Sequence, residues 1–338
     1  LIDLSMTPTG KGQQRLFGQN IKQAVHEAIE LRQRLRTLPI RDIHDVEAMA
    51  RLDAHTRKFV ESSVLIADAL VATTMIWSKK PKQLKAALLD VAIWADDLAS
   101  GGASGRESLI KRTLAANIDD LTPKKRYFHW PLEFPEVFPD DRSGFDGVIG
   151  NPPYINAVAM YGVQSSALLK PYYNHIFSSA SGSYDIYVLF LERAVQLTTS
   201  KGYCGLLVPN KVLSAEYAEL IRRRLVTESQ IASILDYSAV RVFNASVYPV
   251  VIVSTKNTLE RQARVWSAKS NRQVWVPQKV FRDVPSLLWG YVLTDYADLV
   301  AKALLNSEPL VSKIDVVGAA TVSEAYEISP FVHDLDGD

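Results

Sequence analysis

The sequence predicts an α/β fold, and three observations carry this prediction. Apolar runs typical of buried strands alternate with helical segments between residues 145 and 257. The first 120 residues have apolar side chains at helical spacing instead. Residues 258–338 return to short β-like pieces with one helix. We therefore expect part of an open, mostly parallel sheet with helices on its faces, preceded by a helical subdomain and followed by the start of an α+β domain.

Residues 1–120 are expected to form the helical subdomain, inserted ahead of the sheet. Their apolar spacing predicts helices over residues 13–38, 43–77, 84–98 and 107–117. Long helices joined by short connections favour an antiparallel hairpin.

Residues 121–257 are expected to contain the sheet. The aromatic, proline-broken stretch 126–138 should pack on it. A strand, a helix, a strand, a helix and two further strands are predicted in that order, over residues 145–150, 183–194, 203–210, 213–226, 231–237 and 247–255.

The loop Asn151-Pro152-Pro153-Tyr154 directly follows the first predicted strand. Proline fixes its own φ angle, lacks an N–H and restricts the residue before it, so two prolines hold the loop carbonyls in place. The side-chain carbonyl of Asn151 and the backbone carbonyl of Pro152 can then accept from the two N–H bonds of one amino group. Tyr154 offers a flat face for a ring. A plain turn is the alternative, since Asn-Pro is a common turn dipeptide.

Residues 145–156 (FDGVIGNPPYIN) resemble motif IV of the amino-methyltransferases. Residues 145–257 are similar to motifs IV to VIII of DNA adenine methyltransferases. Among these enzymes they resemble the restriction–modification enzymes of the Eco57I family. That family has an Asp-Leu/Ile-Tyr signature, here residues 185–187, and a closing segment, here residues 242–252. The resemblance implies a partial Rossmann-like methyltransferase sheet, with residues 121–257 as the catalytic block.

The resemblance also implies an activity, which is methylation of the N6 amine of adenine in double-stranded DNA. S-adenosylmethionine would be the donor, and the adenine would be flipped out of the duplex. Asn151 and the Pro152 carbonyl would orient the amine, Pro153 would stiffen the loop, and Tyr154 would stack on the base. Phe243 would be the second stacking aromatic, although an aromatic residue before an apolar strand is often a core residue.

Asp185 is the last candidate for a substrate-binding role. It begins a predicted helix, and a carboxylate at that position also has a simple structural explanation, because it interacts favourably with the helix N-terminus. The sequence leaves both roles open.

The donor-binding motif of this family is not recognisable in the sequence. It is a glycine-rich turn between a strand and a helix, and the nearest glycine cluster, residues 101–105, follows a segment with helical spacing. We expect that cluster to be a flexible loop between helices. The expectation is therefore that the principal donor motif lies upstream of Leu1, in a longer enzyme, and that this chain alone is inactive.

Two further functions of the family remain open. Many members carry a nuclease with an Asp/Glu-x-Lys motif, which is absent from these 338 residues, so the sequence does not decide whether a longer polypeptide contains one. Residues 316–321 are similar to the opening of a target-recognition domain, so residues 258–338 are expected to begin that domain. For residues 1–120 a spacer, a partner surface and a DNA clamp are all open.

The composition argues against several classes of protein. The single cysteine argues against a disulfide framework and suits a reducing cytoplasm, and six scattered histidines offer no zinc spacing. The start is polar, no apolar run approaches the length of a membrane span, and a net charge of +1 requires any DNA-binding surface to be local. Two rivals remain, which are a protein glutamine-amide methyltransferase and a non-catalytic DNA-binding module.

Overall fold

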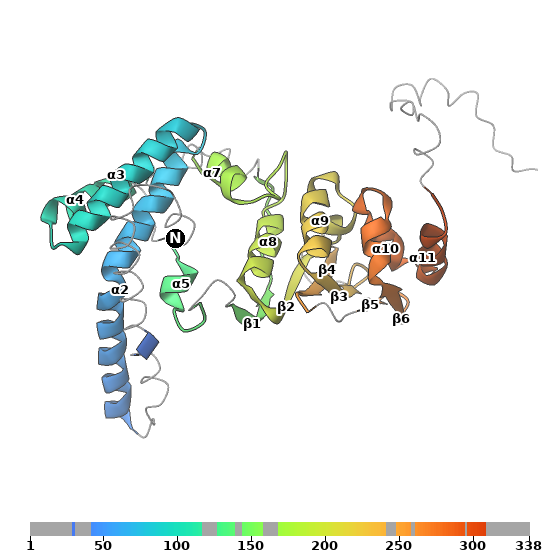
Figure 1. Cartoon of the computed structure of the whole chain (residues 1–338). Coiled ribbons are helices and arrows are strands. Elements are labelled where there is room, and N and C mark those ends of the chain that lie inside the picture. Colours follow the sequence, from blue (N-terminus) through green and yellow to red (C-terminus); the bar gives the residue numbers. More distant parts are fainter. Residues whose placement is uncertain are drawn as a thin grey trace, which may run out of the picture.

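The computed structural model describes residues 29–30, 42–116, 127–138, 144–157, 168–240, 248–257, 261–294 and 296–308 (Figure 1). A group of long helices lies at one end of this part of the chain, and a sheet with helices packed on it lies at the other. The predicted α/β class is confirmed.

The helical subdomain consists of α2 (Ile43–Trp77), α3 (Pro81–Ala99) and α4 (Ala103–Ala115). Asp42 caps α2 by accepting from the backbone N–H groups of His44 and Asp45, and Pro81 occupies the first turn of α3, where its missing N–H is not needed. These helices bury a shared apolar core of Ile66, Ala69, Leu70, Val91, Ala95 and Leu109. The helices predicted in this region are present as α2, α3 and α4. The first predicted helix, residues 13–38, lies almost entirely outside the described residues.

The glycine cluster lies between α3 and α4, as predicted, but in a close turn rather than a flexible loop. Gly101 adopts a φ of +82°, a conformation that favours glycine. The Gly105 N–H donates to a carboxylate oxygen of Asp97 over 2.6 Å. A Cβ on Gly102 or Gly105 would collide with Asp97, and on Gly105 also with the carbonyl of Trp94. Close approach of the two helices therefore explains these glycines.

Six strands of the described residues form one sheet in the order β1-β2-β4-β3-β5-β6. The pairs β1/β2 and β3/β5 are parallel, and the pairs β2/β4, β3/β4 and β5/β6 are antiparallel. The strands are β1 (Phe145–Gly150), β2 (Thr198–Pro209), β3 (Gln230–Asp236), β4 (Pro249–Thr255), β5 (Gln262–Ser267) and β6 (Arg272–Pro277).

The expectation of a mostly parallel sheet is therefore wrong. Only residues 268–271 separate β5 from β6, and only residues 237–248 separate β3 from β4. Short connections join antiparallel strands, whereas parallel neighbours need a longer crossover. β4 consequently runs back between β2 and β3. The sheet also continues past residue 257 into β5 and β6, so the boundary placed there falls within one sheet, and the recognition-domain start remains a prediction.

One face of the sheet is covered by helices (Figure 1). Residues alternate along β2 and β4 between fully buried positions and partly exposed ones, as expected when only one face packs on a core. The large buried side chains of this core include Tyr187, Ile221, Ile234, Phe281 and Trp289. The covering elements are α8 (Tyr187–Leu197), α9 (Glu219–Thr227), α10 (Gln278–Asp283) and α11 (Ala297–Leu305).

An aromatic cluster joins the helical subdomain to the sheet. The ring of Phe145, the first residue of β1, lies 5.6 Å from the ring of Trp130, 5.4 Å from that of Phe134 and 5.2 Å from that of Phe138. Trp130 begins the short helix α5 (Trp130–Glu133). His129, just before α5, pairs with Asp68 of α2 over 2.6 Å. The predicted packing of this stretch on the sheet is confirmed.

The window Val60–Trp77 of α2 corrects one composition-based expectation. Its 18 residues have a mean hydropathy of 1.4, so by length and composition alone this helix could cross a membrane. Half of the window is buried inside the structure, which is equally what a core helix of a water-soluble domain shows.

Candidate active site

The Asn-Pro-Pro-Tyr loop lies at the carboxyl end of the edge strand β1. Asn151 and Pro153 are exposed, Pro152 is buried and Tyr154 is half-buried. The loop is therefore accessible from solvent, while one proline anchors it to the protein. In the parallel pairing, Gly150 lies opposite Leu206, so the loop begins beside the last residues of β2.

A hydroxyl joins the aromatic and amide groups of this loop. The Tyr154 hydroxyl lies 2.8 Å from Oδ1 of Asn151 and 3.1 Å from the backbone carbonyl oxygen of Leu207 in β2. A phenol has one proton, so it donates to one of these acceptors at a time. Burial raises the pKa of Tyr154, which keeps this donor protonated at neutral pH. An amide oxygen has two lone pairs, so Asn151 can accept from Tyr154 and from a ligand together.

The residues after the loop form an antiparallel bridge with the segment before α8. The N–H of Ile186 donates to the carbonyl of Ile155, and the N–H of Ala157 donates to the carbonyl of Tyr184, both over 2.8 Å. Asn156 and Asp185 face each other between these bonds. Their side chains meet, since Nδ2 of Asn156 donates to Oδ1 of Asp185 over 3.1 Å.

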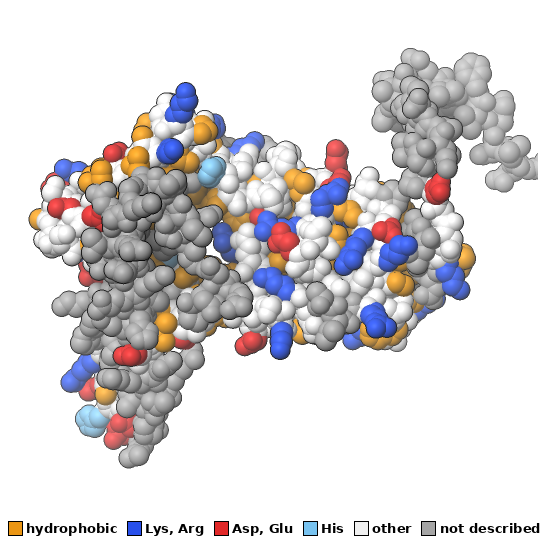
Figure 2. All heavy atoms as spheres, viewed as in Figure 1, with side chains coloured by type: hydrophobic (Ala, Val, Ile, Leu, Met, Phe, Trp, Pro, Cys, Tyr) orange, Lys and Arg blue, Asp and Glu red, His pale blue; other side chains and the backbone are white. Residues whose placement is uncertain are grey.

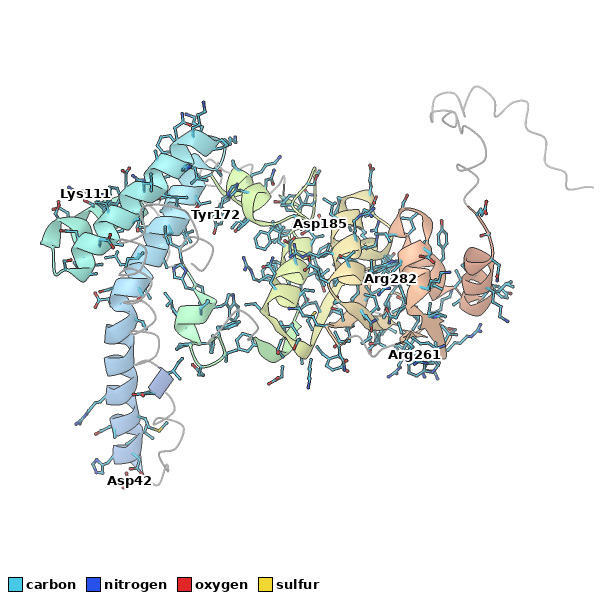
Figure 3. The ribbon with its side chains drawn as sticks, in the orientation of Figure 1. Asp42, Lys111, Tyr172, Asp185, Arg261 and Arg282 are labelled. Carbon is cyan, nitrogen blue, oxygen red and sulfur yellow. The ribbon has the colours of Figure 1, made fainter. Side chains whose placement is uncertain are left out.

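The other carboxylate oxygen of Asp185 receives a hydrogen bond from the segment after β2. The hydroxyl of Tyr217, in η4 (Glu216–Ala218), donates to Oδ2 of Asp185 over 2.7 Å. The Tyr217 oxygen in turn lies 2.9 Å from the hydroxyl of the fully buried Tyr187. Asp185 lies next to α8 (Figure 3). Its carboxylate therefore joins the segment before α8 to the loop after β1 and to η4, which are distant in sequence.

Another aromatic side chain lies at this edge of the sheet. The N–H of Asn210, which begins η3 (Asn210–Leu213) after β2, donates to the carbonyl of Tyr248 over 2.7 Å. Tyr248 immediately precedes β4, and its side chain is 60% exposed. In the strand order β1-β2-β4 it therefore lies two strands from β1, at the end of the sheet where β1 and β2 finish.

The structure brings together only part of the predicted site. Asn151 and Tyr154 contact each other directly, and Asp185 is linked to their loop through Asn156. Phe243 lies outside the described residues, so its stacking role stays a prediction. The sequence did not indicate Tyr217, because it lies in the segment predicted as a helix over residues 213–226 and has no motif around it.

The glycine turn at residues 101–105 does not have the form of a donor cofactor site. The turn at residues 101–105 is explained by packing of α3 on α4, and it follows a helix rather than a strand. Within the described part of the chain, no group of three or more histidine, cysteine or acidic residues is placed to hold a metal ion.

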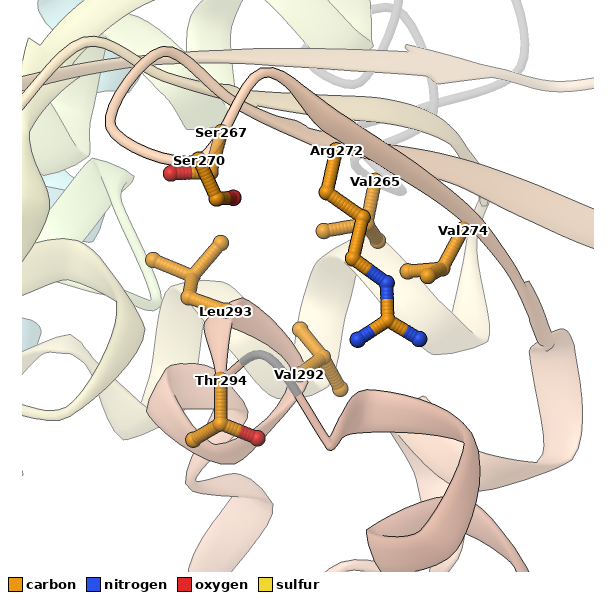
Figure 4. Close-up of a pocket in the computed structure, with 8 residues that line it drawn as sticks. All are labelled: Val265, Ser267, Ser270, Arg272, Val274, Val292, Leu293 and Thr294. Carbon is orange, nitrogen blue, oxygen red and sulfur yellow. The ribbon is translucent and has the colours of Figure 1, made fainter.

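A small pocket lies elsewhere, at the turn between β5 and β6 (Figure 4). Its interior volume is about 10 Å³, which is room for roughly one water molecule. It is therefore too small for a nucleobase. Its lining comes from the β5–β6 hairpin and from η6 (Trp289–Leu293) with the residue that follows it: Val265, Ser267, Ser270, Arg272, Val274, Val292, Leu293 and Thr294.

Comparison with known proteins places this α/β chain in a family of restriction–modification methylases. The family model described as Eco57I restriction-modification methylase matches residues 54–243, which is more than half of the chain, and the chain belongs to this family.

Curated relatives agree with this assignment. Residues of this chain are 26% identical over 168 residues to the type II restriction enzyme and methyltransferase RM.Eco57I of Escherichia coli, covering 43% of this chain and 17% of that protein. They are 23% identical over 99 residues to the type II methyltransferase M.AccI of Acinetobacter calcoaceticus, covering 29% of this chain and 18% of that protein. The chain thus spans less than a fifth of the length of these two relatives.

Solved structures resemble the chain only loosely. The type IIG restriction endonuclease BpuSI aligns with a TM-score of 0.37 and 13% identity, over 87% of this chain and 46% of that one. A type I restriction-modification methyltransferase subunit from Streptococcus thermophilus aligns with a TM-score of 0.30 and 21% identity, over 49% of this chain and 33% of that one.

Proposed function

We propose that this chain carries the base-binding part of a site-specific DNA adenine-N6 methyltransferase in a restriction–modification system. The observation that carries the proposal is the exposed Asn-Pro-Pro-Tyr loop at the carboxyl end of β1. It presents a side-chain carbonyl at the surface beside a half-buried aromatic ring. Membership of the Eco57I restriction-modification methylase family supports the same activity.

The chemistry explains why these residues suit adenine. The lone pair of the exocyclic amine is delocalised into the ring, so the amine is a poor nucleophile. Acceptors on Asn151 Oδ1 and the Pro152 carbonyl would bond its two N–H groups in a tetrahedral arrangement and draw the lone pair out of conjugation. This is orientation and preorganised electrostatics rather than proton transfer by a side chain.

The base would reach the loop by leaving the duplex. An exocyclic amine inside paired DNA is not accessible to such a loop, so the nucleotide is flipped. Tyr154 would stack on the extruded base, which contributes roughly 1–3 kcal/mol in comparable nucleic-acid sites. Phe243 is proposed as the ring on the opposite face.

The donor and the remaining domains are proposed as parts of a longer polypeptide. S-adenosylmethionine is the proposed methyl donor, with its principal binding motif outside the described residues. Residues 1–120 are proposed as an insert, and residues 258–338 as the start of a target-recognition domain.

On the face drawn in Figure 2, basic and acidic side chains are interspersed over α8 to α10, so that face offers no patch of one sign for DNA.

Product analysis tests the proposal. The complete polypeptide would be incubated with duplex DNA and isotope-labelled S-adenosylmethionine, and the DNA would be digested to nucleosides for mass spectrometry. We expect label in N6-methyladenine. Label in a glutamine side chain of a protein substrate would instead identify an amide methyltransferase, and DNA binding without any transferred label would identify a non-catalytic module.

A further inference from the structure

Asp185 is the point where three segments at the carboxyl edge of the sheet meet. Asn156 comes from the loop after β1, Asp185 itself precedes α8, and Tyr217 comes from the segment after β2. Both carboxylate oxygens are used, one by the Asn156 amide and the other by the Tyr217 hydroxyl. A charged acceptor makes stronger hydrogen bonds than a neutral one, so this meeting point is well held.

The direction of the hydrogen bonds in this network follows from counting protons. Tyr217 has one hydroxyl proton, and the carboxylate of Asp185 can only accept. The proton between Tyr187 and Tyr217 therefore belongs to Tyr187, and the chain runs from Tyr187 to Tyr217 to Asp185. Burial raises the pKa of both phenols, so both remain donors at neutral pH.

Capping of α8 does not explain the carboxylate. The N-cap residue of α8 is Ile186, which makes no side-chain capping bond. The side-chain partners of Asp185 are Asn156 and Tyr217, which belong to other segments. The hydrogen bonds of the carboxylate therefore go to other segments and not to the backbone of its own helix.

The bridge at Asn156 fixes the far end of the proposed base-binding loop. β1 ends at Gly150, and the backbone bonds of the bridge begin at Ile155. Only residues 151–154 lie between these two fixed ends, and two of them are prolines with a restricted φ. A displacement of the bridge would therefore move Asn151 and Tyr154 relative to β2.

We infer that Asp185, Asn156 and Tyr217 are positioning residues for the Asn-Pro-Pro-Tyr loop, and that Asp185 does not contact the base. This inference rests on the proposed function and assigns roles within the same site. Asp185 acts on the reaction through Asn156. It holds the loop close enough to β2 for the hydroxyl of Tyr154 to bond to the Leu207 carbonyl.

An exchange of the two facing side chains tests the inference most sharply. Asn156→Asp places two carboxylates against each other, and like charges repel. Adding Asp185→Asn restores the pair with reversed roles, because the new amide donates to the new carboxylate while its oxygen still accepts from Tyr217. We expect the single variant to lose about tenfold to a hundredfold in kcat, as misplaced reacting groups do, with little change in KM for DNA. We expect the double variant to recover most of the loss.

A conservative variant tests the tyrosine of the network separately. Tyr217→Phe removes one hydroxyl and keeps the ring, so we expect kcat to fall several-fold while KM for DNA is unchanged. Tyr296→Phe is the matched control, since its side chain is 70% exposed at the start of α11, far along the sheet. Equal kcat values for Tyr217→Phe and the wild type would remove Tyr217 from the assignment.

Hydrogen–deuterium exchange gives a readout that does not need methylation. We expect the backbone amides of Ala157 and Ile186 to exchange faster in Asn156→Asp than in the wild type, and to regain protection in the double variant. A double variant that stays as impaired in kcat as the single one, or has a raised KM for DNA, would show that the carboxylate itself meets the base and would overturn the inference. A wild-type polypeptide that makes no N6-methyladenine would refute the proposed function, and the exchange data would still decide whether the bridge is positioned as inferred.

Discussion

The hydroxyl of Tyr154 lies 2.8 Å from the side-chain carbonyl of Asn151, so the stacking ring and the amine acceptor of the proposed site are joined to each other. The same hydroxyl reaches the Leu207 carbonyl at 3.1 Å, which relates both groups to β2. Tyr154 therefore has two separable functions, which are its flat face and its hydrogen bond.

Two substitutions at this position separate those functions. Tyr154→Phe keeps the ring but releases Asn151, so we expect kcat to fall by about tenfold because orientation is weakened, with base flipping preserved. Tyr154→Ala also removes the stacking surface, which should cost about 1–3 kcal/mol of binding to the extruded base. Fluorescence of 2-aminopurine at the target position measures flipping, and a single-turnover assay measures methylation. Equal flipping by Ala and wild-type enzymes would exclude the stacking role.

A buried ion pair links α8 to α9 in the part of the chain that carries the proposed site. Glu192 of α8 is fully buried and pairs with Arg224 of α9 over 2.6 Å. It also accepts from the backbone N–H groups of Ser178 and Ser179. Removing the arginine would leave a buried carboxylate without its counter-charge.

Arg224→Ala should therefore lower the free energy of unfolding by about 3 kcal/mol, as loss of one partner of a buried pair does. Arg223→Ala is the matched control, because Arg223 pairs with Glu219 at the surface and should cost less than about 0.5 kcal/mol. Urea denaturation followed by circular dichroism measures both. Similar midpoints for the two variants would contradict the assignment.

The single cysteine offers a probe of the same sheet. Cys204 lies in β2 with 3% of its surface exposed, 2.9 Å from the hydroxyl of Ser254 in β4. Burial raises the pKa of its thiol, so less of the reactive thiolate is present at any pH below that pKa. We expect alkylation at pH 8 to be on the order of a hundredfold slower in the native chain than in urea. Comparable rates in the two conditions would contradict the burial of β2.

Local patterns predicted much of the fold. The strand expected at residues 145–150 is β1 over the same residues, and the strand expected at 231–237 is β3 (Gln230–Asp236). Short apolar runs bounded by turn residues are informative because strand burial is local in sequence. The position of β4 between β2 and β3 was not predictable in this way, because pairing order depends on contacts between distant residues.

The helix expected at residues 213–226 shows what tertiary contacts change. The structure instead has η3 up to Leu213, a turn at residues 214–215, η4 and then α9 from Glu219. Arg222 is buried in α9 and donates to the carbonyls of Val212 and Ala215, which holds this irregular path. Tyr217 lies in η4, where its hydroxyl bonds to Asp185. The segment that departs from a regular α-helix therefore presents the residue that the sequence did not indicate.

The predicted site likewise has a part that local sequence indicates and a part that depends on contacts between distant residues. The position of the loop Asn151-Pro152-Pro153-Tyr154 at the end of β1 was predictable, because proline chemistry and a short motif are both local. The link between Asn156 and Asp185 spans 29 residues and depends on the bridge before α8. Only the three-dimensional structure shows that this carboxylate bonds to Asn156 and Tyr217 from other segments.

The proposed function depends on the side-chain carbonyl of Asn151, which can be removed by a single substitution. Asn151→Ala in the complete polypeptide should lower the single-turnover rate of adenine methylation by about 10²–10³-fold, as loss of a preorganised polar contact does, while the Kd for target DNA stays near the wild-type value. Asn306→Ala, exposed at the end of α11, is the matched control. An Asn151→Ala enzyme that methylates adenine at the wild-type rate would contradict the account.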